Sequence, residues 1–260
     1  MYDQYNRKID YLRISLTDRC NLHCRYCQSE VSEHVPHNEI LRYEELLRIC
    51  RAALQLGIRK FKITGGEPLL RKGCSDFIAG LKQMEGVEQV TLTTNGTLLS
   101  QQLPALIAAG VDSINVSLDT LDAAYYAELT GGSLGSVLQA LQQLQAAGIP
   151  FKLNCVTLAE NGFADIMALL QLADKYNAPL RFIELMPLDC NVDLKGLSGS
   201  EIRSQLEQAC SCSQTHSATA TVLQAIGALA VMQCRWALLN RCTINSALSA
   251  TGCALPPWAC

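Results

Sequence analysis

Three cysteines within eight residues, Cys20, Cys24 and Cys27, are the strongest chemical signal in this sequence. Thiolates are the ligands that iron–sulfur clusters and zinc prefer. A structural zinc site normally takes four protein ligands, usually in two separated pairs, whereas this is a single triplet. Three thiolates on a four-iron cluster would leave one iron open to an exogenous ligand. The zinc alternative needs a fourth ligand from a nearby histidine, and the candidates are His23, His34 and His37.

Two kinds of pattern alternate around and after this triplet. Short apolar or β-branched runs predict strands at residues 11–17, 61–64, 89–94, 113–118, 151–157 and 180–186. Apolar residues at helical spacing predict helices at residues 43–56, 75–84, 101–109, 136–147 and 164–176. Glycines that would end four of these helices follow them, namely Gly57, Gly86, Gly110 and Gly148.

The alternation of strands and helices implies parallel strands with crossover helices, and therefore the α/β class. Six units are too few for a closed eight-stranded barrel, so we expect a partial (β/α)6 TIM-like barrel. Sites in such folds lie at the carboxyl ends of the strands. Distinctive residues follow five of the predicted strands: Cys20, the run 65–68 (Gly-Gly-Glu-Pro), Asn95 with Gly96, Asp119 and Pro187.

Composition excludes several classes of protein. The 260 residues carry a formal net charge of −3 and 49% of them are hydrophobic, which is enough for one large domain with a core. This mild acidity gives no bulk electrostatic reason to expect nucleic-acid binding. The best candidate for a membrane span, residues 220–232, is interrupted by Gln224 and Gly227, so we expect no membrane partner. The N-terminus lacks the hydrophobic segment of a signal peptide, and we expect a cytoplasmic protein.

The chain has 13 cysteines, and without an export signal they indicate metal or redox chemistry better than a disulfide framework. Six of them lie in the last 70 residues, where Ser, Thr, Ala and Cys dominate. From Gln208 onward, Arg235 and Arg241 are the only charged residues. This change of composition predicts a boundary, with the partial barrel at residues 1–207 and an aberrant low-charge tail at 208–260.

The cysteine triplet, with the aromatic Tyr26 before its last cysteine and a Gly-Gly-Glu-Pro run after the second strand, resembles the radical S-adenosylmethionine (SAM) superfamily. The wider context is similar to the GTP 3′,8-cyclase family of molybdenum-cofactor biosynthesis. The resemblance extends from about residue 8 to residue 190, and the segments that carry it are residues 13–20, 64–71, 92–96, 114–119 and 181–186.

This resemblance implies a lyase with a 4Fe-4S cluster on Cys20, Cys24 and Cys27, which donates an electron to SAM to give a 5′-deoxyadenosyl radical. The radical would take hydrogen from C3′ of GTP, and attack on C8 of guanine would give (8S)-3′,8-cyclo-7,8-dihydroguanosine 5′-triphosphate, a precursor of molybdopterin. The partners that it implies are GTP, SAM, a reductant such as flavodoxin or ferredoxin, and a second copy of the chain in a homodimer.

The resemblance also assigns site residues: SAM contacts to Tyr26, Gly66, Ser117 and Met186, and GTP contacts to Arg13, Lys62, Thr93 and Lys152. Lys62 departs from the family pattern, which usually has arginine there. Lysine keeps the charge but loses the bidentate fork. Each residue type has a plainer explanation when taken alone: a glycine or threonine suits a turn, a serine a local hydrogen bond, a methionine core packing, and a cation a solvated strand end.

The family binds a second cluster near its C-terminus through Cys-x2-Cys followed by Asn-Arg-x-Arg and a further cysteine, and this sequence has no such motif. Codons for residues 245–258, read from the third base of the first codon, permit the missing motif. We therefore interpret the tail as a frameshifted or truncated remnant of that region, and a natural lineage-specific tail is the alternative. The chain would then be an inactive cyclase or a non-catalytic protein that binds one cluster and SAM. A radical SAM enzyme with another substrate, such as a peptide, is a further interpretation.

Overall fold

The computed structural model describes residues 2–27, 35–36, 38–186, 191 and 193–213. These residues contain a parallel sheet of six strands in the order β1-β2-β3-β4-β5-β6. The strands are β1 (Tyr11–Ser15), β2 (Lys60–Thr64), β3 (Gln89–Thr94), β4 (Ser113–Ser117), β5 (Phe151–Thr157) and β6 (Leu180–Glu184). All six predicted strands are confirmed, with ends that differ from the prediction by at most two residues.

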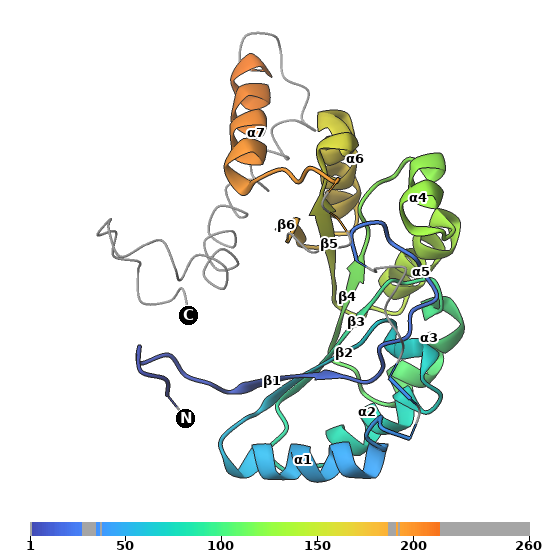
Figure 1. The fold of residues 1–260 in the computed structure, drawn as a ribbon, viewed down its shortest axis with the longest axis vertical. Helices are drawn as coiled ribbons and strands as arrows, with labels where there is room; N and C mark the ends of the chain where they lie inside the picture. Colours follow the sequence, from blue (N-terminus) through green and yellow to red (C-terminus); the bar gives the residue numbers. More distant parts are fainter. Residues whose placement is uncertain (1, 28–34, 37, 187–190, 192, 214–260) are drawn as a thin grey trace.

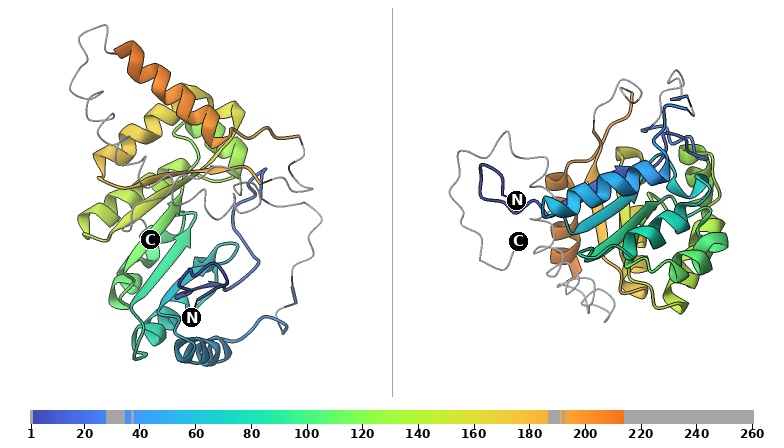
Figure 2. Two further views of the ribbon diagram at one scale, coloured as in Figure 1. Left: turned by 90° about the vertical axis from the view of Figure 1, so that its left-hand side faces the viewer. Right: turned by 90° about the horizontal axis from the view of Figure 1, so that it is seen from below.

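Helices connect the strands and cover one side of the sheet. Their bounds are α1 (Tyr43–Gln55), α2 (Cys74–Lys82), α3 (Leu99–Ala108), α4 (Ala123–Thr130), α5 (Leu134–Ala146), α6 (Gly162–Lys175) and α7 (Gly199–Ser213), with short 3-10 turns η1 (Pro68–Leu70) and η2 (Ala159–Asn161). Figure 1 shows the sheet as a curved arc with α1 to α6 on its outer side, and Figure 2 shows the same arc from two further directions. The predicted α/β class and open, barrel-like arc of six units are confirmed.

Alternation along the strands separates the two faces of the sheet. In β5 every second side chain is buried, from Phe151 to Thr157. Leu153 and Cys155 belong to the core that the sheet shares with the helices. Because successive side chains of a strand point to opposite faces, Lys152 and Asn154 lie on the concave face. The sequence pattern therefore gives this arc an apolar outer face and a polar inner face.

Two helices were not predicted from the sequence, α4 and α7. The local signals for α4 are nevertheless present, because the Asp122 carboxylate accepts a hydrogen bond from the backbone N–H of Tyr125 at 2.9 Å. The helix ends at Gly131, whose φ of +73° lies in the left-handed region. A helix of eight residues between two strands is too short for apolar periodicity to identify.

The helix α7 packs against β6 and continues to Ser213, across the boundary predicted after residue 207. The remainder of the predicted tail, residues 214–260, lies outside the described residues, and so does Pro187. Among the helices of the described ranges, none combines the length and apolar character that crossing a bilayer requires.

Candidate functional site

Four cations lie on the concave face of the sheet: Arg13 on β1, Lys62 on β2, Lys152 on β5 and Arg181 on β6. They lie on this face because successive side chains of a strand point to opposite faces of the sheet. Arg181, for example, stands between the buried Leu180 and Phe182. The four side chains are held by strands rather than by loops, so their backbone positions are fixed by the ladder of the sheet.

Curvature of the sheet brings these charges together. Burial, together with the positive charges of Arg181, Arg13 and Lys152, lowers the pKa of Lys62 to about 8. Four strand spacings separate β2 from β6, which would be about 19 Å in a flat sheet. Yet Arg181 acts on Lys62 more strongly than Arg13 does from the neighbouring strand. The concave face therefore gathers positive charge from both ends of the sheet.

Hydroxyl and amide groups lie between the cations. Thr93 pairs in register with Asn115, and Asn115 with Lys152. The Asn115 side-chain amide donates to Thr93 Oγ1 at 3.3 Å, and Arg13 Nε donates to the Thr64 hydroxyl at 3.3 Å. All four residues predicted to contact GTP, including Thr93, thus share the concave face.

The cysteine loop follows β1 and is held by α4, one of the helices that the sequence analysis missed. The backbone N–H of His23 donates to the carbonyl of Thr130 at 2.9 Å, and that of Arg25 to the carbonyl of Leu129 at 3.0 Å. Between Cys20 and these bonds, Leu22 is only 4% exposed. The loop is therefore fixed against the end of α4 by backbone bonds and an apolar anchor.

Two of the three thiols lie in surroundings that favour the protonated form. Burial raises the pKa of Cys20, and it raises the pKa of Cys24 to about 12, with added effects of the charges of Asp119, Cys27 and Cys20. Within the described ranges, no group of three or more His, Cys, Asp or Glu side chains is arranged to hold a single metal ion. A four-iron cluster takes each thiolate on a different iron, so its ligands need not meet at one point. Loading such a cluster would displace the thiol protons.

Two glycines let the loop after β2 pack flat against the segment that leads into Cys20. The backbone N–H of Gly66 donates to the Thr17 carbonyl at 2.7 Å, and that of Glu67 to the Arg19 carbonyl at 2.8 Å. A Cβ added at Gly65 would lie 2.6 Å from the Thr17 carbonyl oxygen, and one at Gly66 would overlap the carbonyl of Arg19. Glycine is needed here for close backbone approach, and Gly66 itself remains exposed.

Tyr26 connects the cysteine loop to the carboxyl ends of β4 and β5. Its hydroxyl donates to Asp119 Oδ2 at 2.6 Å, and the other carboxylate oxygen of Asp119 accepts from the backbone N–H of Val156 at 2.8 Å. Asp119 is only 3% exposed, and this burial raises its pKa to about 6. A buried carboxylate with two strong donors thus fixes the aromatic ring between Cys24 and Cys27.

Asn191 joins two of the residues predicted to contact SAM. Its side-chain amide donates to the Tyr26 carbonyl at 2.9 Å and to the Met186 carbonyl at 3.1 Å. Asn191 is 3% exposed, whereas the Met186 side chain is exposed after the end of β6. Ser117 ends β4 on the concave face, where it pairs in register with Asn154. Tyr26, Gly66, Ser117 and Met186 therefore all lie at the carboxyl edge of the sheet.

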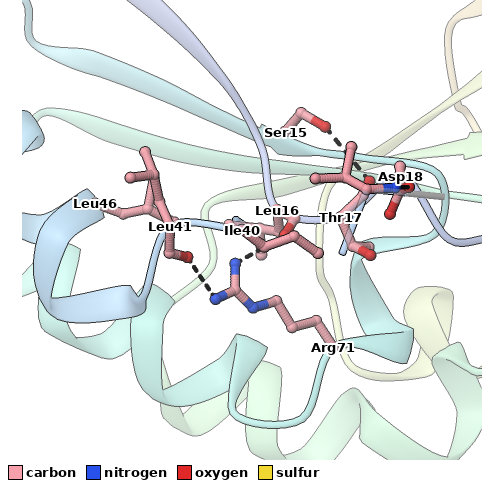
Figure 3. A pocket seen from close by; sticks show the side chains of 9 residues that line it. Ser15, Leu16, Thr17, Asp18, Ile40, Leu41, Leu46 and Arg71 are labelled. Atoms are coloured by element: carbon pink, nitrogen blue, oxygen red, sulfur yellow. Dashed lines mark hydrogen bonds between the residues drawn. The ribbon is translucent and has the colours of Figure 1, made fainter. Parts of the chain in front are cut away.

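A pocket of about 230 Å³ lies beside the end of β1, and its lining includes none of the four cations (Figure 3). Arg71 reaches across it, donating to the Leu16 carbonyl at 2.7 Å and to the Leu41 carbonyl at 2.6 Å. Its guanidinium also lies 4.2 Å from the ring centroid of Tyr43. These contacts fasten the start of α1 to the end of β1, and we assign no ligand to this pocket.

Sequence reasoning did not assign roles to four residues that the structure brings into the site. Arg181 was identifiable, because it alternates with buried residues in β6 as Lys152 does in β5. Asn95 and Asp119 were noted only for following strands. Asn191 has no signal in its local sequence, since its partners Tyr26 and Met186 are brought to it by the fold.

Comparison with known proteins defines the class. Residues 14–173 match the radical SAM superfamily. This match covers more than half of the chain, and the chain therefore belongs to the radical SAM superfamily.

The most similar curated relatives include several proteins named GTP 3′,8-cyclase. The relative from Pelotomaculum thermopropionicum is 46% identical over 191 residues, which cover 72% of this chain and 59% of the relative. The relative from Thermodesulfovibrio yellowstonii is 42% identical over 213 residues, covering 80% and 66%. The relative from Clostridium perfringens is 40% identical over 204 residues, covering 78% and 63%. The chain thus spans about three fifths to two thirds of the length of these relatives.

Solved structures share the fold at low identity. SuiB from Streptococcus suis, bound to SAM, has a TM-score of 0.66 and 19% identity, covering 81% of this chain and 49% of SuiB. TYW1 with a lysine–pyruvate adduct has a TM-score of 0.56 and 16% identity, covering 76% and 72%. These likenesses concern the fold alone and support the partial barrel.

Proposed function

We propose that this chain acts as a radical SAM GTP 3′,8-cyclase, which converts GTP to (8S)-3′,8-cyclo-7,8-dihydroguanosine 5′-triphosphate. One observation carries this proposal: Arg13, Lys62, Lys152 and Arg181 gather on the concave face of the sheet. A triphosphate has several negative charges, and charged donors in a partly dehydrated site bind them most strongly. The activity named for the relatives in three bacteria supports the same substrate.

The mutual electrostatic effects of the four cations favour an anionic ligand. The pKa of Lys62 is lowered to about 8 by burial and by three positive neighbours, so its charged form is disfavoured without a counter-charge. A bound triphosphate would reverse that effect and return the pKa of the lysine towards its ordinary value. The guanidinium groups of Arg13 and Arg181 offer bidentate forks that suit phosphate oxygens. Thr93, between them on β3, offers a hydroxyl to the nucleotide.

We assign one 4Fe-4S cluster to Cys20, Cys24 and Cys27, and SAM to Tyr26, Gly66, Ser117 and Met186. When bound and reduced by an electron donor of the flavodoxin or ferredoxin class, the cluster and SAM supply a 5′-deoxyadenosyl radical that can take the C3′ hydrogen of GTP. The residues of the chain bind and orient the reactants. The bond from Tyr26 to Asp119 fixes the loop between two ligands, and Asn191 holds Tyr26 close to Met186.

The substrate proposal is tested by Arg13→Ala. We expect GTP affinity to fall strongly while SAM cleavage remains, because Arg13 lies on the concave face and not on the cysteine loop. Arg51→Ala, on the exposed surface of α1, is the matched control and should leave both properties unchanged. Unchanged GTP affinity in Arg13→Ala would count against a triphosphate and favour another substrate, such as a peptide.

The cluster proposal is tested by metal analysis of anaerobically purified, reconstituted protein. About four irons and four sulfides per chain would support one cluster, about eight irons would indicate a second site, and zinc alone would exclude the radical mechanism. Product analysis then separates an active cyclase from a protein that binds SAM without turnover. The active enzyme forms 5′-deoxyadenosine together with the cyclic nucleotide.

A further inference from the structure

Cys20 differs from an ordinary buried thiol because two N–H groups point at its sulfur. The backbone N–H of Leu22 donates to Cys20 Sγ at 3.4 Å, and the side-chain amide of Asn95 donates at 3.7 Å. Distances to sulfur are longer than those to oxygen because the sulfur atom is larger. The first donor belongs to the cysteine loop itself, whereas the second comes from the turn after β3, 75 residues along the chain.

The orientation of the Asn95 amide is fixed by its other partners. The backbone N–H of Thr97, which can only donate, lies 3.0 Å from Asn95 Oδ1, and the Thr97 hydroxyl donates to the same oxygen at 2.7 Å. The oxygen therefore faces Thr97 and the NH₂ group faces the cysteine loop. The second proton of this NH₂ group goes to Asn21 Oδ1 at 3.0 Å. Both ends of the amide are satisfied, so it has no reason to flip.

The backbone of Asn95 is held as firmly as its side chain. Its N–H donates to Glu67 Oε2 at 2.7 Å, and Glu67 Oε1 accepts from the Thr94 hydroxyl at 2.8 Å. The Glu67 carboxylate is fully buried. Because Glu67 belongs to the glycine loop after β2, it ties Asn95 to the same edge of the sheet as Cys20. The donor that faces the sulfur is therefore positioned by a buried network that joins the ends of β2 and β3.

We infer that Asn95 tunes the cluster held by Cys20, by donating an N–H hydrogen bond to that ligand and so making the cluster easier to reduce. Hydrogen bonds to ligand sulfurs are a principal determinant of iron–sulfur potentials, because they stabilise the more negative, reduced state. Reduction adds one electron to the cluster, and the electron comes from a chemical or protein reductant. This inference rests on the proposed assignment of a cluster to Cys20, Cys24 and Cys27.

A plainer role for Asn95 is to shape the turn after β3, since its Oδ1 accepts from the N–H two residues on. Two substitutions separate the roles. Asn95→Asp and Asn95→Ser both keep a side-chain oxygen for the turn, but neither can donate an N–H to Cys20. The serine variant is neutral, so it removes the donor without adding a charge. Thr97→Val is the matched control, because it removes the hydroxyl bond of the same turn but keeps the backbone N–H that bonds Asn95 Oδ1, and so keeps the donor facing Cys20.

The test is a potentiometric titration of the reconstituted full-length chain, followed by electron paramagnetic resonance without SAM. In Asn95→Ser the ratio of reduced to oxidised cluster at the midpoint potential of the parent should fall about fivefold, the factor that loss of one ordinary hydrogen bond gives. Asn95→Asp should shift the midpoint further in the negative direction, and Thr97→Val should leave it unchanged. Unchanged midpoints in both Asn95 variants, or an equal shift in Thr97→Val, would overturn the inference.

A measurement on the unaltered chain covers the case in which the Asn95 variants lose the cluster. Protein labelled with ¹⁵N in asparagine should show a coupling between the reduced cluster and a side-chain ¹⁵N in pulsed electron paramagnetic resonance. Absence of that coupling overturns the inference while leaving the cluster assignment intact. Failure of the parent to take up iron would overturn the cluster assignment, and the inference with it, so the two failures are distinguishable.

Discussion

The cysteine loop and the cation set on the concave face are built in opposite ways. In the loop, polar groups are satisfied within the protein: His23 and Arg25 donate to the end of α4, and Tyr26 donates to a buried carboxylate. On the concave face, positive charges from four strands repel one another. Burial, together with this repulsion, lowers the pKa of Lys62. The cysteine loop is therefore stabilised by bonds within the protein. On the concave face, a bound anion would reduce the repulsion between the cations.

This difference separates positioning from binding. A loop that must present three thiols to a cluster needs fixed geometry, which backbone bonds and buried hydrogen bonds supply. A site for a highly charged anion gains affinity from charges that repel one another until the anion neutralises them. Substitutions in the two regions should therefore affect different measurements, and five predictions test that separation.

The largest effect is expected for Cys24→Ala. Removing a cluster ligand should reduce the iron content from about four per chain to near zero and abolish SAM cleavage. GTP binding, measured by equilibrium dialysis, should remain, because the cations lie on strands that the loop does not form. Cys50→Ala, at a buried thiol of α1, is the control and should retain its iron. A cluster of normal content in Cys24→Ala would remove that residue from the ligand set.

The next effect is expected for Arg181→Ala, the cation that sequence reasoning left without a role. Losing a charge-assisted contact of about 1.5–3 kcal/mol should weaken GTP binding about ten- to a hundredfold. Iron content should match that of the parent. Arg51→Ala serves again as a charge-matched control on an exposed helix surface. Parent-like affinity in Arg181→Ala would remove Arg181 from the nucleotide site.

A smaller effect on stability is expected for Tyr26→Phe. The substitution leaves the buried Asp119 carboxylate without its hydroxyl donor, and an unsatisfied buried group costs about 1–3 kcal/mol. Urea denaturation of the full chain measures the change. Tyr125→Phe is the control, because that hydroxyl makes longer contacts of 3.3 and 3.5 Å with Glu160 and Asn161 near the surface. Equal decreases in the free energy of unfolding of the two variants would show that the bond to Asp119 stabilises the chain no more than the surface contacts of Tyr125 do.

The smallest effect concerns Lys62 and pH. The pKa of Lys62 is about 8 in the folded chain, below the ordinary value of 10.5, so the unfolded chain binds more protons between these pH values. Without nucleotide, Lys62→Met should therefore be more stable than the parent below pH 8, by less than about 1 kcal/mol after solvent screening. This advantage should decline as pH rises from 8 and vanish by about pH 10.5. Urea midpoints across this range give the measurement, and a pH-independent difference would contradict it.

GTP binding should show the opposite preference at the same residue. Because a triphosphate favours charged Lys62, affinity of the parent should fall as pH rises through about 8, and this pH dependence should weaken in Lys62→Arg, whose guanidinium stays charged. Isothermal titration with GTP at several pH values provides the comparison. The same pH dependence in both proteins would assign it to another group.

Much of the fold followed from local pattern. Strand periodicity located all six strands, since alternation in a sheet buried on one face leaves a clear signal. The short helix α4 left no such signal, although its C-terminal end holds the cysteine loop. The boundary after residue 207 was predicted from a change in composition. The composition of a segment does not define where a helix ends, and α7 continues to Ser213. The residues predicted to contact GTP and SAM could be placed on strands or on the loops that follow them, but their partners could not.

The sequence by itself determined the ligand chemistry and the order of the elements, because thiol spacing and apolar periodicity are local properties of the chain. Only the tertiary structure decided which distant groups meet. Curvature of the sheet brings Arg181 to bear on Lys62 across four strand spacings, and the packing of strand ends aims the Asn95 amide at Cys20. Such contacts join residues about 75 to 120 positions apart, as with Asn95 and Cys20 or Arg181 and Lys62, and no local pattern in the sequence specifies them.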